Sequence, residues 1–201
     1  MNYKFDKVFE SFSKNYKLVP LEVFKKDPYK TLISTVLSSR TKDETTSEAS
    51  KRLFKVAPNV IRLNQLSIRE IQHRIYPVGF YKTKARHLKM LSERILKEFR
   101  GEIPLTGSDL ISLPGVGIKT ANLVLNRAFD IPAIAVDTHV HKISNLLGWV
   151  KTKTPEQTER DLVKIVPKKY WSDMNRLFVS IGRQFTTKKK LEDFLKGEDL
   201  I

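Results

Sequence analysis

Hydrophobic residues recur at helical spacing along almost the whole chain, and this pattern limits the possible folds more than any other feature of the sequence. Near the start, one helical stripe carries four of them: Phe5, Val8, Phe9 and Phe12. No segment alternates hydrophobic and polar residues for long enough to indicate a β-sheet. The sequence therefore predicts an all-α protein.

Residues that begin or end helices divide this pattern into segments. Asp27 and Pro28 predict an N-cap and the first position of a helix, because Asp accepts hydrogen bonds from free helix N–H groups and proline needs none. The next helix is expected to begin at or near Asp43 and to be closed by Pro58, with a short polar link after it.

Further helix starts are predicted at Ser67, Thr83, Ser108 and Thr154, which can all cap a helix through a hydroxyl group. At Thr154 the run Thr-Pro-Glu-Gln also predicts a capping box. In the C-terminal tail, helical spacing predicts a short docked helix with three apolar residues on one face: Leu191, Phe194 and Leu195.

Charge and cysteine content narrow the classes of function. The 201 residues include 37 Lys and Arg against 22 Asp and Glu, which gives a net charge of +15. Such a surface attracts nucleic acid, whereas a charge-rich thermophilic surface, the alternative, would carry balancing glutamates. The absence of cysteine excludes disulfides, a thiol nucleophile and cysteine-held zinc or iron-sulfur sites.

The sequence shows no signal-peptide pattern and no apolar run of about 18 residues, the length that spans a membrane. We therefore expect a soluble protein of the cytoplasm that does not associate with membranes.

The segment 113–120, LPGVGIKT, has the form of a tight glycine hairpin between two helices. Main-chain N–H groups of the turn and of the second helix would point outward and form a phosphate site. The alternative is a plain turn between helices. We expect nucleic-acid contacts from most of this segment: Leu113, Pro114, Gly115, Val116, Gly117, Ile118 and Thr120.

Lys119 falls in the first turn of the second helix, where the positive end of the helix dipole disfavours a cation. It lies opposite the apolar stripe of that helix and so points into a cleft or solvent. A lysine beside a helix N-terminus and other cations loses its proton more readily, as an amine nucleophile requires. Taken alone, the same residue is more typical of a simple phosphate contact than of a nucleophile.

Asp137 follows the apolar run Ile134-Ala135-Val136 and precedes a helical segment, which predicts an N-cap carboxylate near the site. Capping alone is the alternative. His139 and His141 have the spacing of a metal pair, but residues two apart on a helix point in different directions. We therefore predict no metal site, and we assign both histidines to structure or to the neighbourhood of a phosphate.

The fragment 79–84, GFYKTK, combines a turn with two aromatic residues and two lysines. Lys82 and Lys84 are therefore candidate phosphate contacts. An ordinary helix junction with solvated lysines explains the same residues equally well.

Together these residues are similar to a known family. The run LPGVGIKTANLVLNRAF followed by IAVDTHVHKISN resembles the hairpin, catalytic lysine and catalytic aspartate of the endonuclease III branch of the helix-hairpin-helix DNA glycosylases, and weaker similarity covers residues 25–185. The resemblance implies a six-helix lobe of residues 23–132 with the motif at about 107–129. It implies a second lobe of residues 1–22 and 133–201, with Lys119 and Asp137 facing each other between the lobes.

The resemblance also implies an activity on double-stranded DNA with a damaged base or an abasic site, by a monomer. The target base, an oxidised pyrimidine first of all, would be flipped out of the duplex. Lys119 would attack the sugar, and β-elimination would then cut the strand, with Asp137 stabilising positive charge. Relatives can hold a monovalent cation at the hairpin when DNA is bound, and no other cofactor is expected here.

Two departures from the family pattern affect these expectations. The usual four-cysteine iron-sulfur loop is absent, and the run Thr186-Thr187-Lys188-Lys189-Lys190 lies where it would begin, so we hypothesise that the basic run keeps part of its DNA contact. Arg40 stands where relatives usually have a glutamine that fills the space left by the flipped base. The alternatives are a noncatalytic hairpin module and a glycosylase for uracil or mismatched thymine.

Overall fold

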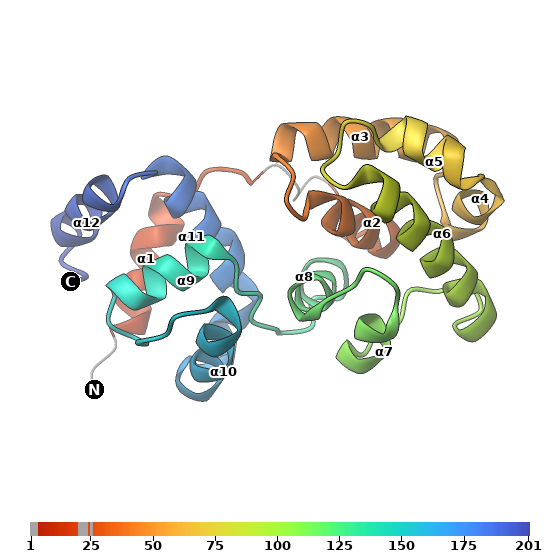
Figure 1. Ribbon diagram of the computed structural model, residues 1–201. Helices are drawn as coiled ribbons and strands as arrows, with labels where there is room; N and C mark the ends of the chain where they lie inside the picture. Colours follow the sequence, from red (N-terminus) through yellow and green to blue (C-terminus); the bar gives the residue numbers. More distant parts are fainter. Residues whose placement is uncertain (1–3, 20–23, 25) are drawn as a thin grey trace. The chain divides into compact units, whose positions relative to one another are not determined.

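The computed structural model describes residues 4–19, 24 and 26–201, and every regular element in these residues is a helix (Figure 1). The all-α prediction is confirmed for this part of the chain. The chain divides into two compact units, Pro20–Ile131 and Met1–Val19 with Pro132–Ile201. We call the first the hairpin unit and the second the terminal unit. The predicted boundary between residues 22 and 23 lies outside the described residues.

The hairpin unit is built around α2, whose residues are buried almost without interruption. Leu32, Ile33 and Leu37 of this helix are fully buried, and α2 packs against α3, α6 and α8 (Figure 1). Its helices are α2 (Pro28–Ser38), α3 (Asp43–Val56), α4 (Val60–Gln65), α5 (Ile68–Ile75), α6 (Tyr81–Glu98), α7 (Gly107–Ser112) and α8 (Ile118–Phe129).

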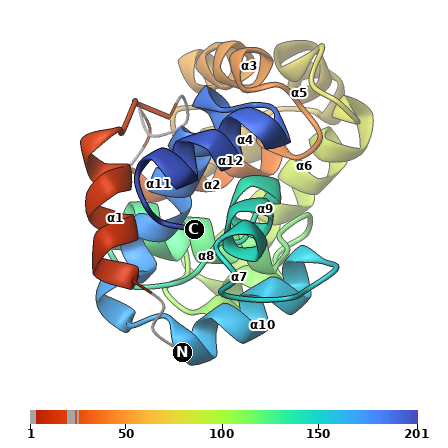
Figure 2. The same ribbon diagram turned by 90° about the vertical axis from the view of Figure 1, so that its left-hand side faces the viewer.

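The terminal unit joins the first residues of the chain to the last seventy. Its central helix α11 packs against α1 and α9, and α10 packs against α9 (Figures 1 and 2). Phe12 of α1 meets Phe178 of α11 edge to face, with ring centroids 5.0 Å apart. Its elements are α1 (Phe5–Lys14), α9 (Thr138–Leu146), α10 (Pro155–Ile165), the short 3-10 helix η2 (Lys168–Tyr170), α11 (Trp171–Gln184) and α12 (Lys188–Gly197).

Several predicted helix starts are confirmed by side-chain caps. Asp27 accepts a hydrogen bond from the Lys30 N–H at 2.9 Å, and Ser67 forms a full capping box with Glu70. Thr154 also caps its helix, but the predicted box is wrong: the Gln157 amide oxygen accepts from the Lys153 N–H instead of the Thr154 N–H.

Two predicted starts lie too late in the sequence, that of α6 by three residues and that of α7 by two. Helix α6 begins at Tyr81 rather than after Thr83, because Phe80 adopts a left-handed conformation (φ 57°) that turns the chain directly into the helix. Helix α7 is capped by Thr106 rather than Ser108, since the Thr106 hydroxyl accepts from the Asp109 N–H at 3.1 Å.

The supposed polar link after α3 contains a six-residue helix, α4. Asn59 caps it by accepting from the Arg62 N–H at 2.9 Å, and Val60 and Leu63 are buried. A helix of fewer than two turns offers too few residues to show a period, which is why the pattern did not indicate it.

The C-terminal tail forms the predicted docked helix, α12. Leu191 and Leu195 are buried in the core of the terminal unit, and Phe194 stacks on Phe185 with centroids 4.3 Å apart. Among the described helices, none is long and apolar enough to cross a membrane.

Candidate active site and nucleic-acid interface

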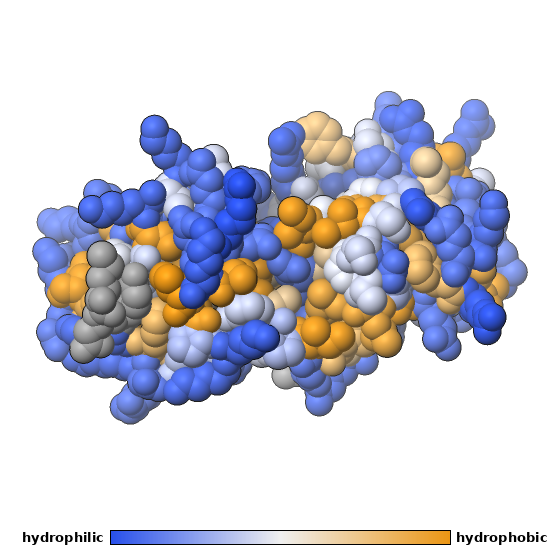
Figure 3. Space-filling view, turned by 90° about the horizontal axis from the view of Figure 1, so that it is seen from below, coloured by the Kyte–Doolittle hydropathy of each residue, from blue (hydrophilic) through white to orange (hydrophobic). Residues whose placement is uncertain are grey.

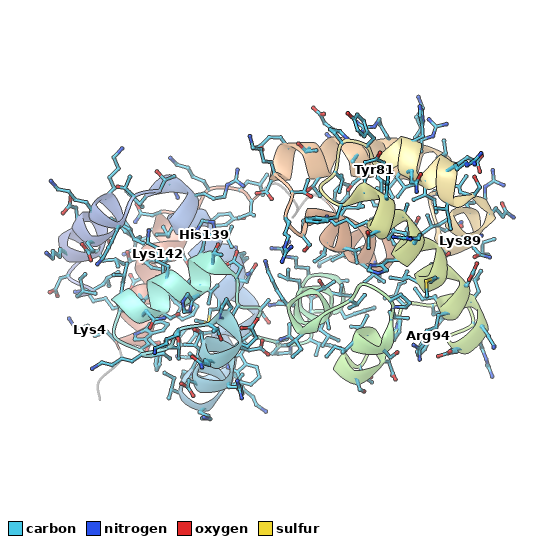
Figure 4. All side chains as sticks on the ribbon, in the orientation of Figure 1. Lys4, Tyr81, Lys89, Arg94, His139 and Lys142 are labelled. Carbon is cyan, nitrogen blue, oxygen red and sulfur yellow. The ribbon has the colours of Figure 1, made fainter. Side chains whose placement is uncertain are left out.

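The segment 113–117 forms a tight hairpin between α7 and α8. Leu113 and Val116 point into the core of the hairpin unit with 2% and 7% of their surface exposed, and the Val116 N–H donates to the Leu113 carbonyl at 3.1 Å. Arg94 of α6 donates to the Ser112 carbonyl at 2.6 Å, so the end of α7 is tied to α6 (Figure 4). Pro114 is half-buried at the turn. The hairpin is therefore anchored through its apolar residues.

The two glycines of this hairpin differ in whether the structure around them has room for a side chain. Gly115 has φ 80°, and a Cβ there would lie 2.8 Å from Nδ1 of His87, so only glycine fits without strain. Gly117 has φ −99°, and a Cβ there would meet no atom within 4 Å. The conformation of the turn itself therefore requires glycine at Gly115 and not at Gly117.

Helix α8 begins with its N-terminus free of any side-chain cap in the described residues. Ile118 and Lys119 are exposed and Thr120 is half-buried. Lys119 is the second residue of the helix, as predicted, and within the described residues its ammonium makes no hydrogen bond or ion pair. The free N–H groups and this ammonium make the start of α8 strongly electropositive.

Hydrophobic side chains gather over α7 and α8 on the face drawn in Figure 3. Three large apolar residues in or beside these helices are well exposed: Leu105 at 57%, Ile111 at 43% and Ile118 at 49%. The hairpin thus presents apolar side chains together with main-chain donors, a combination that suits contact with sugars and phosphates.

Arg40 lies in the turn between α2 and α3, in a left-handed conformation (φ 52°) and exposed. Its guanidinium lies 5.5 Å from the centroid of the Phe80 ring, a cation-π contact. Phe80 is itself 61% exposed. The two residues form one projecting pair that the sequence, where they are forty positions apart, did not indicate.

The two lysines of the segment 79–84 lie in different environments. Lys82 is exposed in the first turn of α6 and is free to meet an external phosphate. Lys84 is 7% exposed, and its ammonium donates to the Leu37 and Ser39 carbonyls and to the Thr41 hydroxyl. These bonds use its three donors, so the structure contradicts the predicted phosphate contact of Lys84.

Asp137 is the N-cap of α9, as predicted. Its Oδ1 atom accepts hydrogen bonds from the His139 N–H at 3.0 Å and the Val140 N–H at 2.9 Å. No group in the described residues donates to Oδ2. The extended run before it is buried, and the buried Asn175 of α11 donates to the Ala135 carbonyl at 2.9 Å. The carboxylate is therefore held firmly and remains half-exposed.

The two histidines of α9 point toward different helices, as their spacing predicted. His139 packs on Gly182 of α11, where a Cβ would lie 2.2 Å from its Nδ1 atom. His141 Nδ1 lies 2.6 Å from the Thr158 hydroxyl of α10. Figure 4 shows His139 and Lys142 on this helix. No cluster of potential metal ligands occurs among the described residues.

The lysines of the tail, Lys188, Lys189 and Lys190, form the exposed first turn of α12, and Thr187 caps that helix. They form a basic turn on the surface of the terminal unit.

The structure contains the three features that the sequence predicted. They are a glycine hairpin followed by an uncapped helix start, an exposed lysine one residue into that helix, and a capping aspartate eighteen positions later. Residues 33–168 match a protein family described as "HhH-GPD superfamily base excision DNA repair protein". The chain belongs to this superfamily. Within the HhH-GPD proteins it is endonuclease III-like, which confirms the resemblance seen in the sequence.

Individual relatives and a solved structure are consistent with this family assignment. The chain is 46% identical over 158 residues to endonuclease III of Thermotoga maritima, which covers 79% of this chain and 74% of that protein. It is 41% identical over 159 residues to endonuclease III-like protein 1 of Mus musculus, covering 78% of this chain and 53% of that protein. A trapped covalent intermediate of endonuclease III with DNA superposes with a TM-score of 0.81 at 29% identity, covering 94% of this chain and 89% of that one.

Proposed function

We propose that this HhH-GPD protein is a base-excision-repair DNA glycosylase with abasic-site lyase activity, which removes oxidised pyrimidines from duplex DNA. The observation that carries the proposal is Lys119, an exposed amine in the first turn of α8 that makes no hydrogen bond or ion pair with the described residues. A noncatalytic hairpin module would need the backbone grip but not this amine. The likeness to a covalent endonuclease III–DNA intermediate supports the same reading.

The hairpin binds a backbone phosphate. The uncapped N–H groups at the start of α8 donate to its oxygens, and the positive end of the helix favours its charge. Gly117 supports this assignment, because it has room for a Cβ in the free protein and so its small size serves a ligand that approaches from outside. Lys82, Ile118 and Thr120 extend the contact to neighbouring sugars and phosphates.

Lys119 is the nucleophile. Its neutral amine attacks C1′ of the damaged nucleotide, forming a C–N bond as the glycosidic bond breaks and the base departs with the bonding electrons and takes up a proton. The sugar ring then opens to leave an imine between Lys119 and C1′. Loss of a proton from C2′ and departure of the 3′ phosphate oxygen cut the strand by β-elimination, and hydrolysis of the imine frees the enzyme.

Asp137 stabilises the positive charge that develops on the same sugar. Because both main-chain donors go to Oδ1, the Oδ2 atom is left for the reacting nucleotide or for a proton in transit. The cap holds the carboxylate in place without neutralising it. His139, packed on Gly182, carries the first N–H of this cap and belongs to the support of the site.

The iron-sulfur cluster of the endonuclease III branch does not fit this chain. Its thiolate ligands require cysteine, and the sequence has none. We propose that the enzyme acts without a cluster, that hydrophobic packing of α12 stabilises the tail, and that Lys188, Lys189 and Lys190 retain DNA contact. Arg40 fills the space of the flipped base, where its guanidinium stacks and donates.

A borohydride trapping experiment tests the activity. Wild-type protein with abasic-site duplex DNA should form a stable covalent adduct, because borohydride reduces the imine. Lys119→Ala should form none, whereas Lys97→Ala, which removes an exposed lysine from the last turn of α6, should trap as wild type does. Absence of an adduct from wild-type protein that excises a base would refute the lyase assignment.

A panel of single-lesion duplexes identifies the substrate. Excision of thymine glycol and other oxidised pyrimidines should exceed excision of uracil or of thymine mispaired with guanine. The reverse order would support the mismatch-directed alternative. Tight binding with no excision of any lesion would support the noncatalytic module.

A further inference from the structure

Two loops of the hairpin unit meet at one buried ammonium group. Lys84, in the first turns of α6, donates to the Leu37 carbonyl at 2.8 Å, to the Ser39 carbonyl and to the Thr41 hydroxyl at 3.2 Å. The first two acceptors are carbonyls at the end of α2, where a helix leaves its last carbonyls without main-chain partners inside the helix. Lys84 therefore joins the start of α6 to the turn that follows α2.

The ammonium of Lys84 carries no ion pair within the part of the chain that the structure describes. No carboxylate contacts it in the described residues, and burial lowers the pKa of Lys84 to about 8. The C-terminal end of α2 favours a cation because the helix dipole is negative there. A buried charge that no carboxylate neutralises nevertheless opposes folding. The main contribution of Lys84 is therefore the relative position of the two loops that it joins, rather than stability.

The same two loops are joined by two further contacts. The Gly79 N–H donates to the Thr41 hydroxyl at 3.1 Å, and Lys84 donates to the same hydroxyl. This one hydroxyl, on the loop after α2, therefore accepts from both the loop before α6 and α6 itself. A Cβ at Gly79 would lie 2.5 Å from the Arg40 carbonyl oxygen, which means that the loop before α6 presses directly on the backbone of Arg40. Together, Lys84, Thr41 and Gly79 fix the position of Arg40.

Arg40 and Phe80 need such support. Both adopt left-handed conformations, with φ of 52° and 57°, and neither is a glycine. These conformations are strained for residues with a side chain and persist where the surroundings impose them. Each residue sits on one of the two joined loops, and both side chains project into solvent with the guanidinium over the ring.

We propose that Lys84 is a positioning residue for the Arg40–Phe80 pair: its ammonium sets the relative placement of the two loops and so the depth and direction at which Arg40 enters the duplex. This inference rests on the proposed function, in which Arg40 occupies the space of the flipped base beside the opposite base. Lys84 touches no DNA. Its loss should change the discrimination among opposite bases through Arg40.

A double-mutant cycle tests the coupling. Single-turnover excision is measured on one lesion placed opposite each of the four bases, and affinity is measured on the matching abasic-site duplexes. Lys84→Met should reduce the ratio between the fastest and the slowest excision rate among the four opposite bases by roughly tenfold. We call this ratio the opposite-base spread, and a change of this size is typical of a small misplacement of a reacting or orienting group. In an Arg40→Ala background, Lys84→Met should have no further effect, because the residue through which it acts is gone.

Lys89→Met is the matched control. Lys89 lies on the same helix (Figure 4) and its ammonium also donates to a main-chain carbonyl, that of Asn64, but it contacts neither loop. It should leave the opposite-base spread unchanged. Thr41→Val removes only the shared hydroxyl, so it replaces Lys84→Met if that variant unfolds, and it should shift the spread in the same direction.

Additive effects of Lys84→Met and Arg40→Ala, or an unchanged spread in both Lys84→Met and Thr41→Val, would overturn the positioning role. A wild-type protein that traps on abasic-site DNA but shows no opposite-base preference would also overturn it while leaving the proposed function intact. Failure of the proposed function would appear separately, as the absence of both excision and trapping in wild-type protein.

Discussion

Lys84 should make the stability of this protein rise with pH over a range in which most proteins gain nothing. Burial lowers the pKa of its ammonium to about 8 from an ordinary value of 10.5. Between these two values the unfolded chain holds a proton that the folded protein has released, so unfolding takes up a proton and the free energy of unfolding increases with pH. Below about pH 8 both states are charged and the penalty of the buried charge is fully present.

The size of the effect follows from the two pKa values. Raising the pH from about 7 to about 9.5 should add roughly 2 kcal/mol to the free energy of unfolding, since each unit of pKa difference is worth about 1.4 kcal/mol. At still higher pH the free energy of unfolding should stop rising because of Tyr29. The hydroxyl of Tyr29 donates to the Ala57 carbonyl in the core, and burial raises its pKa. The folded protein keeps that phenol proton above about pH 10, where the unfolded chain loses it, so stability then falls.

Urea unfolding at closely spaced pH values measures the effect. Wild-type protein should show the rise, Lys84→Met should show a flat profile over the same range, and the exposed Lys97→Met should keep the wild-type rise. A flat wild-type profile, or a rise that survives in Lys84→Met, would refute the assignment of a charged, desolvated ammonium at this position.

Three other predictions concern the candidate site and the tail. Gly115→Ala should lower stability by about 1 to 3 kcal/mol in thermal unfolding, because it places a side chain at positive φ against His87, whereas Gly117→Ala should melt near wild type but bind abasic-site DNA more weakly. Asp137→Asn should keep the cap and the melting temperature yet lose at least about a hundredfold in excision rate, and equal activity would contradict the role of the charge. Neutralising residues 188–190 together should reduce the salt slope of DNA affinity by up to about three, and an unchanged slope would exclude their contact with phosphates.

The sequence predicted the fold class and most helix starts because these depend on local chemistry. A cap such as Asp27 or Ser67 bonds N–H groups only three residues away, and the neighbouring sequence contains everything needed. One error arose where the decisive feature was a backbone conformation. Phe80 in a left-handed conformation starts α6 early, and nothing in a phenylalanine indicates that.

The candidate site could be predicted only in part for a related reason. The positions of Lys119 and Asp137 at helix starts followed from neighbouring residues and are confirmed, whereas their joint action on one nucleotide stays a prediction. The supporting contacts of His87 under Gly115 and Asn175 on the Ala135 carbonyl join residues far apart in the sequence. No local pattern indicates them, since each depends on how helices pack.

Lys84 and Lys119 show how far tertiary context decides the chemistry of a residue. Both are lysines in the opening turns of helices that follow glycine-containing turns, where the helix dipole disfavours a cation. The start of α6 meets carbonyls at the end of α2, so the ammonium of Lys84 points inward and its three donors are bonded inside the protein. The start of α8 has no side-chain cap in the described residues, and there the ammonium of Lys119 is exposed and makes no hydrogen bond or ion pair. Among these two lysines, Lys84 has its three donors used inside the protein, whereas Lys119 keeps its donors for an external partner, as its proposed role requires.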